Sequence, residues 1–572
     1  MPKTKKHIVR VARSKKLDTR KYGKGGSAAG RVLILFPNQL FAVPVLDSLL
    51  GGGGFRVILI EHPLYYERVE DKVKFSQLKL VYHRATVRCY IDYLKEQGVQ
   101  GMVVDVDECL AMHSGLPGVI RKYVTSGTGV QIAYRSHSIL SPPPVGENLV
   151  KRQCLDTGLE TQCLRYIDPV DSRLSDEITK CSGLTRLESP LFMLKSTDIA
   201  EYEKTHKTNG RLMHSVFYAW HRDKLGILAG SKTYDTENRS RMPPGLTVPE
   251  LPNVKAGQAY ITAAVKYIKE HAKWSKHPGA AHLDNQLFPL THEESRRWLD
   301  RFLAERFHLF GKYQDSIAVS ADGEPQNFLF HSCISPMLNI GLLTPQEVID
   351  RVVEFRKAHT EKIPMAAYEG FIRQIIGWRE YQRYIYVTIG DRIRKMNHFG
   401  NQRRLTQAWY DGTTGIQPVD DAIKMGFRDG YLHHILRLMV VGNFMNLVGI
   451  HPDDAYRWFM EFALDAYDWV MVGNVYSMAM WADGGMTMRK PYISSSKYIL
   501  DMSNYSAKGS EWPEKWPEKW NAVYHHFIDR NGDALLKTYH AGIVRALRRK
   551  AGTAGVKTEL ALAKQIIESV SE

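Results

Sequence analysis

Residues 431–446 constrain the fold most, because ionisable groups interrupt an otherwise apolar run there. At helical period, most of this stretch is apolar, and one side carries His434, Arg437, Val441 and Met445. We therefore expect a largely buried helix. A buried histidine close to a buried arginine needs hydrogen-bonding partners or a bound ligand, because an unpaired buried charge is costly. Both a structural and a functional role for His434 are open on this pattern alone.

The length and the charge of the chain bound its organisation. A chain of 572 residues is too long for one compact core, so two or three domains are expected. The net charge of +16 is concentrated in residues 1–26, which hold ten Lys or Arg residues and one Asp. We predict a disordered basic tail over residues 1–27. Three roles are open for it: a solvated segment without a partner, a contact with nucleic acid, or a targeting signal. The rest is only mildly basic, so any nucleic-acid site must be a local patch.

The sequence indicates neither a membrane span nor a metal site. No apolar run approaches the roughly 18 residues that a span requires, and no signal-peptide core is present. A soluble, intracellular protein is predicted, in the cytoplasm, the nucleoid or the nucleus. The six cysteines are scattered, without a Cys-x-x-Cys pair or a zinc-like spacing to histidine, so we expect reduced thiols and no metal ligands.

The first part of the chain alternates short apolar runs with a helical stretch at residues 74–97. Three runs have the β-rich composition of buried parallel strands: residues 31–36, 55–60 and 101–106. This pattern predicts a doubly wound α/β domain over residues 28–165, with ligands beyond the carboxyl ends of its strands. A dinucleotide fingerprint is missing, because the glycines at 51–54 precede a strand instead of opening a helix.

The second half of the chain is helical in its periodicity. Before it, the pattern is irregular from residue 138 to residue 252, with three consecutive prolines at 142–144. This predicts an interdomain connection, which we assign to residues 166–257. Residues 258–572 predict a large all-α domain. Its helices are expected at residues 260–272, 293–310, 345–357, 368–389, 431–446 and 455–468.

Aromatic, arginine and small polar residues cluster in four segments of this helical half: residues 330–343, 369–381, 430–446 and 465–505. Together the segments resemble the photolyase/cryptochrome family of flavoproteins. The resemblance is to the deoxyribodipyrimidine photolyase-related branch, the iron–sulfur bacterial cryptochromes and prokaryotic (6-4) photolyases. It implies an α/β antenna domain, an all-α FAD-binding domain, and light-driven electron transfer from reduced FAD to damaged DNA.

The resemblance also implies a cofactor site. It places Ser332, Ser335 and Asn339 near the phosphates or the ribityl chain of FAD, and Trp378 in the cofactor-binding set. Arg437 looks like the arginine that pairs with an acidic residue beside the flavin ring, and Asp465 looks like that partner. Such a pair is physically sensible, because a cation stabilises a reduced, anionic flavin.

Three further residues resemble the catalytic set of the family. Cyclobutane-dimer photolyases carry asparagine at the position of His434, whereas (6-4) photolyases carry a histidine that gives a proton to the lesion. Reversing a (6-4) photoproduct requires a proton donor with a pKa near the working pH, which suits histidine. Gln374 and Tyr492 look like lesion-contacting residues, and the lesion must leave the base stack to reach them. His433 is expected only to support packing.

Electron-transfer and antenna residues follow from the same resemblance. Trp458 looks like the tryptophan next to the flavin in the photoreduction chain. Phe459 and Tyr410 stand where relatives often have tyrosine and tryptophan, which leaves the photoreduction route open. An antenna, 6,7-dimethyl-8-ribityllumazine, is a possible second chromophore, with contacts from Gln39, Glu61 and Tyr66.

The cysteines that name the branch are missing. They would fall near Pro418, Ser506, Gly509 and Glu518, and none of these is cysteine. Thiolates are the usual ligands of iron–sulfur clusters, so we predict no cluster. We expect tryptophan side chains to fill the local core in place of a cluster: Trp512, Trp516 and Trp520.

The sequence favours one function and leaves two alternatives. The favoured one is a (6-4) DNA photolyase, which is a lyase and a chromophore-bearing flavoprotein of DNA repair. We expect it to bind UV-damaged DNA, to work as a monomer and to have no membrane partner. The first alternative is a cryptochrome-like blue-light photoreceptor without repair. The second is a flavin-free nucleic-acid-binding module, because primase large subunits share a related helical core.

Overall fold

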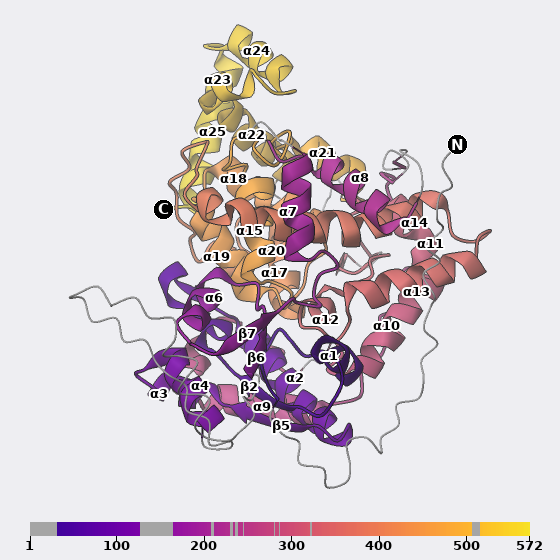
Figure 1. The fold of residues 1–572 in the computed structure, drawn as a ribbon. Coiled ribbons are helices and arrows are strands. Elements are labelled where there is room, and N and C mark those ends of the chain that lie inside the picture. The colour runs from indigo at the N-terminus through magenta and orange to yellow at the C-terminus, as the bar shows by residue number, and fades with distance from the viewer. Residues whose placement is uncertain are drawn as a thin grey trace.

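A computed structural model describes residues 31–125, 164–206, 211–228, 233–234, 238–243, 245–279, 281–284, 287–320, 323–505 and 515–572. The predicted basic tail at residues 1–27 lies outside these ranges. A smaller α/β part lies below a larger helical part in Figure 1. From the helical part, a projection rises at the top, formed by α23 (Gly532–Leu535), α24 (Ala541–Lys550) and α25 (Ala554–Val570).

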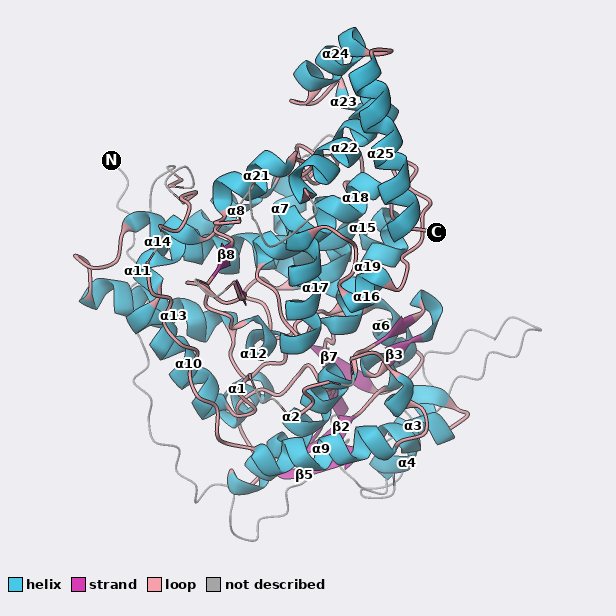
Figure 2. Ribbon diagram, turned by 180° about the vertical axis from the view of Figure 1, so that it is seen from behind, coloured by secondary structure: helices cyan, strands magenta, loops and turns pink. Residues whose placement is uncertain are grey.

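Five parallel strands form the main sheet, in the order β5–β2–β1–β6–β7. They are β1 (Val32–Leu35), β2 (Arg56–Ile60), β5 (Gln100–Val104), β6 (Leu164–Ile167) and β7 (Leu184–Leu187). In Figures 1 and 2, the sheet is surrounded by α1 (Val43–Leu50), α2 (Gln77–Glu96), α6 (Ser172–Thr179) and α9 (Gln258–Glu270). From β1 the chain first adds β2 and β5 on one side, and then returns to add β6 and β7 on the other side of β1. The carboxyl ends of β1 and β6 therefore border the expected ligand crevice.

The sheet extends further along the chain than its sequence pattern predicts. The expected boundary at residue 165 falls inside β6, and β7 lies within the predicted connection over residues 166–257. The edge strand β7 has two exposed residues, Thr185 and Arg186, and therefore lacks the continuous apolar run of a central strand. The predicted connection also contains helices: α6, α7 (Ser196–Thr205) and α8 (His214–Leu225).

The helical part confirms the predicted fold class, an α/β doubly wound domain followed by a large all-α domain. Helices lie at five of the expected positions: α9, α10 (His292–Glu305) with α11 (Phe307–Tyr313), α13 (Pro345–Ala358), α14 (Met365–Ile372) with α15 (Glu380–Arg394), and α19 (Pro452–Phe462). The Thr291 and Thr344 hydroxyls cap α10 and α13 by accepting from backbone amides. By contrast, α9 packs along α2 of the α/β part, where Tyr260 donates to Asp92 at 2.7 Å.

Three π-helical stretches interrupt the core of the helical part: η6 (Arg373–Arg379), η7 (Leu436–Gly442) and η8 (Val472–Ala479). The helix expected at residues 431–446 starts only at His434 and takes π-helical spacing from Leu436. The predicted α-helical face is therefore interrupted: His434 and Arg437 are partly exposed, whereas Val441 and Met445 are buried. Such stretches are rare and frequently mark functional sites. Gly442 is needed here, because a Cβ would lie 2.9 Å from the Ala479 Cβ on η8.

A buried ion cluster joins the two parts of the molecule. Arg68, in β3 (Glu67–Arg68), lies 2.6 Å from Asp171 and 3.5 Å from Asp468, the first residue of α20 (Asp468–Met471). Asp468 also accepts from Arg394 and from the hydroxyls of Tyr386 and Tyr456. Burial alone would raise the pKa of Asp468, but Arg68 and Arg394 hold it below its ordinary value.

No helix among the described residues has the length and apolarity needed to span a membrane.

We expect Arg68→Ala to lower the free energy of unfolding by about 3–5 kcal/mol, because the change leaves buried carboxylates without their cation. Urea denaturation measures this. The matched control is Lys497→Ala, which breaks an exposed pair with Asp501 and should cost no more than about 0.5 kcal/mol. Equal unfolding midpoints for the two variants would contradict a structural role for the cluster.

Candidate functional site

A buried ion pair forms the centre of the candidate site. The guanidinium of Arg437 donates to both carboxylate oxygens of Asp465, at 2.9 and 3.0 Å. The Ser335 hydroxyl donates to the same carboxylate at 2.6 Å, and the Asn339 amide donates to the Asp465 carbonyl at 2.7 Å. Ser335 and Asn339 are one turn apart on α12 (Ser335–Asn339). The structure thus brings together four residues that the sequence placed at a cofactor.

A further cation completes this network. Arg379, the last residue of η6, donates to the Asn339 side-chain oxygen and to the Leu191 carbonyl. Burial lowers the pKa of Arg379 to about 9. The sequence analysis did not single out Arg379, although this residue directly follows Trp378 in one of the four segments that carry the family resemblance. Its polar partner is 40 residues away, so only the fold could show the contact.

Three histidines lie close together, and two of them, His433 and His434, are near Arg437. His434 is solvent-accessible, although protein surrounds it, and desolvation together with Arg437 lowers its pKa to about 4. His433 is fully buried, and its ring stacks on His331 with centroids 4.6 Å apart. Among the described residues, neither ring nitrogen of His433 nor the Nε2 of His331 has a hydrogen-bond partner. Unpaired polar atoms beside an accessible imidazole fit a site that receives a polar ligand.

The other predicted site residues lie around this centre without bonding to it. The Trp378 ring stacks on His214 at 3.7 Å, and Gln374 donates to the Gly370 carbonyl at 3.2 Å. The Ser332 carbonyl accepts from the Trp298 indole at 2.8 Å, which fixes the loop that precedes α12. Among the described residues, neither Trp378 nor Gln374 makes a hydrogen bond to the Arg437–Asp465 pair. Their roles stay predictions.

Tyr492 lies at a basic and aromatic surface. Its side chain is half-buried. Burial is the main cause of the raised pKa of Tyr539, and the nearby Tyr492 raises that pKa further. Tyr539 is 61% exposed, and the Lys490 ammonium lies 4.7 Å above its ring. Arg489 is exposed beside Lys490. Phosphates and unpaired bases are the groups that such a surface can contact.

Trp458 and Tyr410 are linked through neighbouring residues. The buried Trp458 indole donates to the Trp409 carbonyl at 2.7 Å. Tyr410 is half-buried, and its hydroxyl donates to Glu461 at 2.8 Å. Phe459 packs edge-on against Trp458, with ring centroids 5.0 Å apart. Glu461 carries no motif in the sequence, but it lies one helical turn after Trp458.

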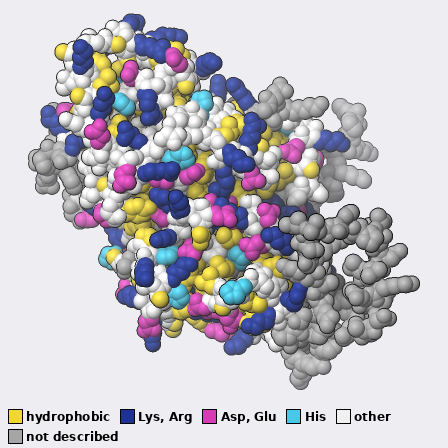
Figure 3. Space-filling model, turned by 90° about the vertical axis from the view of Figure 1, so that its left-hand side faces the viewer, with side chains coloured by type: hydrophobic (Ala, Val, Ile, Leu, Met, Phe, Trp, Pro, Cys, Tyr) yellow, Lys and Arg dark blue, Asp and Glu magenta, His cyan; other side chains and the backbone are white. Residues whose placement is uncertain are grey.

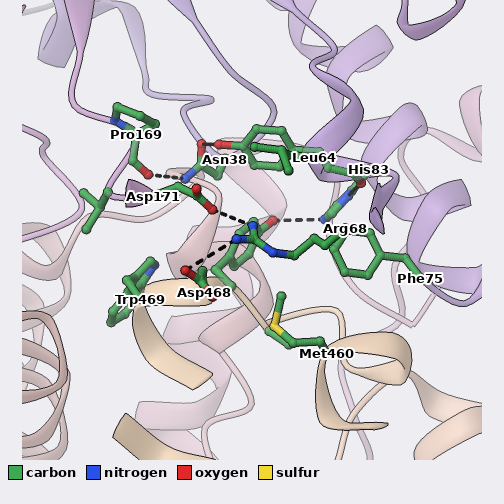
Figure 4. A pocket seen from close by; sticks show the side chains of 14 residues that line it. Asn38, Leu64, Arg68, Phe75, His83, Pro169, Asp171, Met460, Asp468 and Trp469 are labelled. Carbon is green, nitrogen blue, oxygen red and sulfur yellow. Dashed lines mark hydrogen bonds and ion pairs between the residues drawn. The ribbon is translucent and has the colours of Figure 1, made fainter. Parts of the chain in front are cut away.

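A small pocket lies in the crevice between β1 and β6 and borders the helical part (Figure 4). Asn38 donates to the Pro169 carbonyl at 3.1 Å across this crevice. Arg68 lies between Asp171 and Asp468, as Figure 4 shows. The charged groups that line the pocket are thus paired with one another.

The predicted antenna residues do not line this pocket. The Gln39 amide donates to the Ile167 and Asp168 carbonyls, each at 3.0 Å, and thereby ties the end of β1 to the end of β6. Glu61 is buried and accepts from the Tyr66 hydroxyl and from two arginines, Arg84 and Arg88. These contacts use the polar atoms that a lumazine would need. They do not support an antenna role, which stays a prediction.

The region of the missing cysteines is packed with aromatic rings where the structure describes it. Trp516 and Trp520 are buried in α22 (Trp516–Arg530), and the Trp520 ring stacks on Phe444 at 5.2 Å. Among the described residues, no group of histidine, cysteine and acidic side chains could hold a metal. Ser506, Gly509 and Trp512 lie outside the described residues. The absence of a cluster therefore stays a prediction.

We expect Asp465→Ala to lower FAD content severalfold, because Arg437 and Ser335 lose their shared acceptor and a buried cation is left unpaired. The visible absorbance of the purified protein measures bound flavin. Asp501→Ala, on an exposed helix face, is the control and should retain full FAD content. Unchanged flavin content in Asp465→Ala would show that the pair does not support the cofactor site.

Comparisons with known proteins identify the family. The model for deoxyribodipyrimidine photo-lyase-related protein matches residues 128–288, and the model for the FAD binding domain of DNA photolyase matches residues 371–540. The second match contains Trp378, Arg437 and Asp465.

Individual relatives agree with these matches. A (6-4) photolyase of Agrobacterium fabrum is 35% identical over 338 residues, which cover 57% of this chain and 64% of that protein. The uncharacterized protein R855 of Acanthamoeba polyphaga mimivirus is 53% identical over 95 residues, covering 17% of this chain and 73% of that protein. The crystal structure of a bacterial class III photolyase from Agrobacterium tumefaciens shares the fold, with a TM-score of 0.51 at 15% identity over 94% of this chain and 98% of that one.

The sequence matches, the shared fold and the Arg437–Asp465 pair inside the FAD-binding match agree with one another. The chain belongs to the deoxyribodipyrimidine photolyase-related branch of the photolyase/cryptochrome family and carries the FAD-binding domain of DNA photolyases.

Proposed function

We propose that this protein repairs (6-4) pyrimidine photoproducts in DNA under blue or near-UV light. The observation that carries the proposal is His434, an accessible imidazole next to the Arg437–Asp465 pair at the edge of the predicted cofactor site. The similarity to a relative named as a (6-4) photolyase supports it. When bound, reduced FAD supplies the electron that light transfers to the lesion.

The residues around the ion pair would hold the cofactor. Arg437 presents a fixed cation, because Asp465 binds it through two parallel hydrogen bonds. Ser335 and Asn339 offer small polar groups from α12, and Ser332, three residues before that helix, would add a third. The unpaired nitrogens of His331 and His433 fit such a polar occupant.

His434 would act as the proton donor. Its pKa is lowered to about 4 in the protein alone, so its imidazole is neutral at physiological pH. Donation requires the imidazolium, and the phosphates of bound DNA would favour that form by adding negative charge nearby. Binding of the lesion would thus load His434 with the proton that it gives up.

The DNA would approach across the surface of Lys490, Tyr492 and Tyr539. These residues offer a cation for phosphate and rings for bases that leave the stack. Lys and Arg side chains also gather at the top of the molecule in Figure 3, over α23, α24 and α25. Arg545, Arg549 and Lys550 on α24 are exposed there. Electrostatic contact with a long DNA substrate would be salt-dependent.

The two alternatives remain separable by experiment. The match to a photolyase FAD-binding domain favours a flavoprotein over a primase-like module. A cryptochrome-like photoreceptor would share the same fold and the same flavin. It would show no repair of (6-4) lesions under light, which the following experiment tests with the unmodified protein.

We expect His434→Ala to retain FAD and to lose at least about 100-fold in repair rate, because a positioned general acid contributes about 100- to 10,000-fold. The assay follows loss of (6-4) photoproducts in an oligonucleotide under blue light, with flavin absorbance checked in each sample. His113→Ala changes an exposed histidine far from the site and should repair normally. Full repair by His434→Ala would refute the assignment, as would absence of repair by the unmodified protein.

We expect the repair rate at saturating DNA to fall as pH rises from about 6 to about 8, by no more than about tenfold per unit. The sign holds for any imidazolium donor, because the fraction of imidazolium shrinks as pH rises through its pKa. Bound DNA would raise that pKa from about 4 in the protein alone towards the working range. Single-flash repair yields measure the chemical step. A yield that is constant over this range would show that His434 is not the titrating donor.

A further inference from the structure

The structure connects Trp458 to Tyr410 by a short covalent and hydrogen-bonded path. The Trp458 Nε1–H donates to the Trp409 carbonyl at 2.7 Å, and that carbonyl belongs to the peptide unit that joins Trp409 to Tyr410 in α16 (Ala408–Asp411). A second path runs through Phe427 on α17 (Gln417–Asp429), whose ring lies 6.0 Å from Trp458 and 5.9 Å from Tyr410. Tyr410 is therefore well coupled to Trp458.

Other aromatic neighbours are poorer electron donors to Trp458. The Phe459 and Phe462 rings, at 5.0 and 4.7 Å, have no easily oxidised group. The Trp409 indole can be oxidised, but it packs on Phe444, donates to the Val570 carbonyl and is fully buried, so an external reductant cannot reach it. Tyr410 combines an oxidisable ring with partial exposure, so an external reductant can reach it.

The hydroxyl of Tyr410 faces a proton acceptor. It donates to Glu461 Oε2 at 2.8 Å, and the Lys74 amide donates to the other oxygen at 3.2 Å. Glu461 is only 4% exposed. The charged side chains around it are Arg457 on the same helix and Lys74 on β4 (Val73–Lys74), and both favour the carboxylate.

The titration of the two groups suits a proton transfer. Burial raises the pKa of Glu461 to about 7, against the opposing influence of Tyr410, Lys74 and Arg457. Burial and Glu461 raise the pKa of Tyr410, so Tyr410 keeps its proton at rest. An oxidised tyrosine is a strong acid and releases that proton to any base within hydrogen-bond reach.

We propose that Tyr410 is the terminal internal electron donor of photoreduction and that Glu461 accepts its proton. The inference rests on the flavin site of the proposed function. Trp458, which the family resemblance places next to the flavin, would supply one electron to bound FAD after light excitation. Tyr410 would then return one electron to Trp458 and transfer its phenolic proton to Glu461 Oε2, so that the flavin keeps the electron that Tyr410 has lost. The products are a neutral tyrosyl radical and a protonated Glu461. A thiol reductant restores Tyr410 with one electron, and the proton returns from Glu461.

The test is transient absorption of the FAD-loaded protein after a blue flash. The unmodified protein should form a long-lived neutral tyrosyl radical. Glu461→Gln, which keeps the side-chain size, should lower the radical yield at least tenfold, and Tyr410→Phe should abolish it. Flavin absorbance in each variant checks folding. An unchanged tyrosyl yield in Glu461→Gln would overturn the proposal.

A rescue separates proton transfer from simple structural damage. A tryptophan radical cation needs no base, so Tyr410→Trp combined with Glu461→Gln should photoreduce as well as Tyr410→Trp alone. Failure of the double variant, with success of the single one, would show that Glu461 acts only by packing. In the unmodified protein, the tyrosyl yield should fall as pH falls through the pKa of Glu461, because a protonated carboxyl accepts no proton.

A dark measurement needs no photochemistry. The infrared carboxyl band that Glu461→Gln removes should titrate near neutral pH, and a midpoint close to that of an ordinary glutamate would count against the proposal.

Lesion repair by the unmodified protein distinguishes the photoreduction inference from the proposed repair function. A protein that forms the tyrosyl radical but repairs no (6-4) lesion would refute the proposed repair alone. Repair without that radical would refute only the present inference.

Discussion

The bidentate pair between Arg437 and Asp465 is the interaction on which the site depends. Both partners lie in the interior of the helical part, where an unpaired charge would cost several kcal/mol. The structure meets that cost by giving the carboxylate a third donor in Ser335 and by fixing the backbone through Asn339. One carboxylate therefore sets the positions of α12 and η7, and Arg379 extends the same network to η6.

The same short segment of chain also joins the two parts of the molecule. Asp465 faces the candidate site, and Asp468, three residues later, binds Arg68 and Arg394 at the interface. The crevice between β1 and β6 lies against this segment, but ion pairs and the Gln39 amide occupy its polar groups. Domain packing and site geometry are thus coupled through residues 465–468.

The π-helical stretches show why helical periodicity alone misplaced some faces. Each π turn changes the angular step between residues, so η7 presents Arg437 differently from an α-helix. Gly442 permits the close approach of η7 to η8, which no Cβ would allow without movement. The same irregularity leaves His433 buried and His434 accessible, although the two are adjacent. The predicted packing residue, His433, and the predicted proton donor, His434, therefore differ in burial.

The sequence by itself determined the fold class, the central strands, most of the helices and the family, because apolar periodicity and ordered motifs are local properties of the chain. It also brought forward Ser335, Asn339, Arg437 and Asp465, which the fold gathers into one network. Only the tertiary structure decided that Gln39 and Glu61 bind protein groups, that Arg379 reaches Asn339, and that Glu461 faces Tyr410. Most of these partners lie between 23 and 129 residues apart, and only packing decides which polar groups meet.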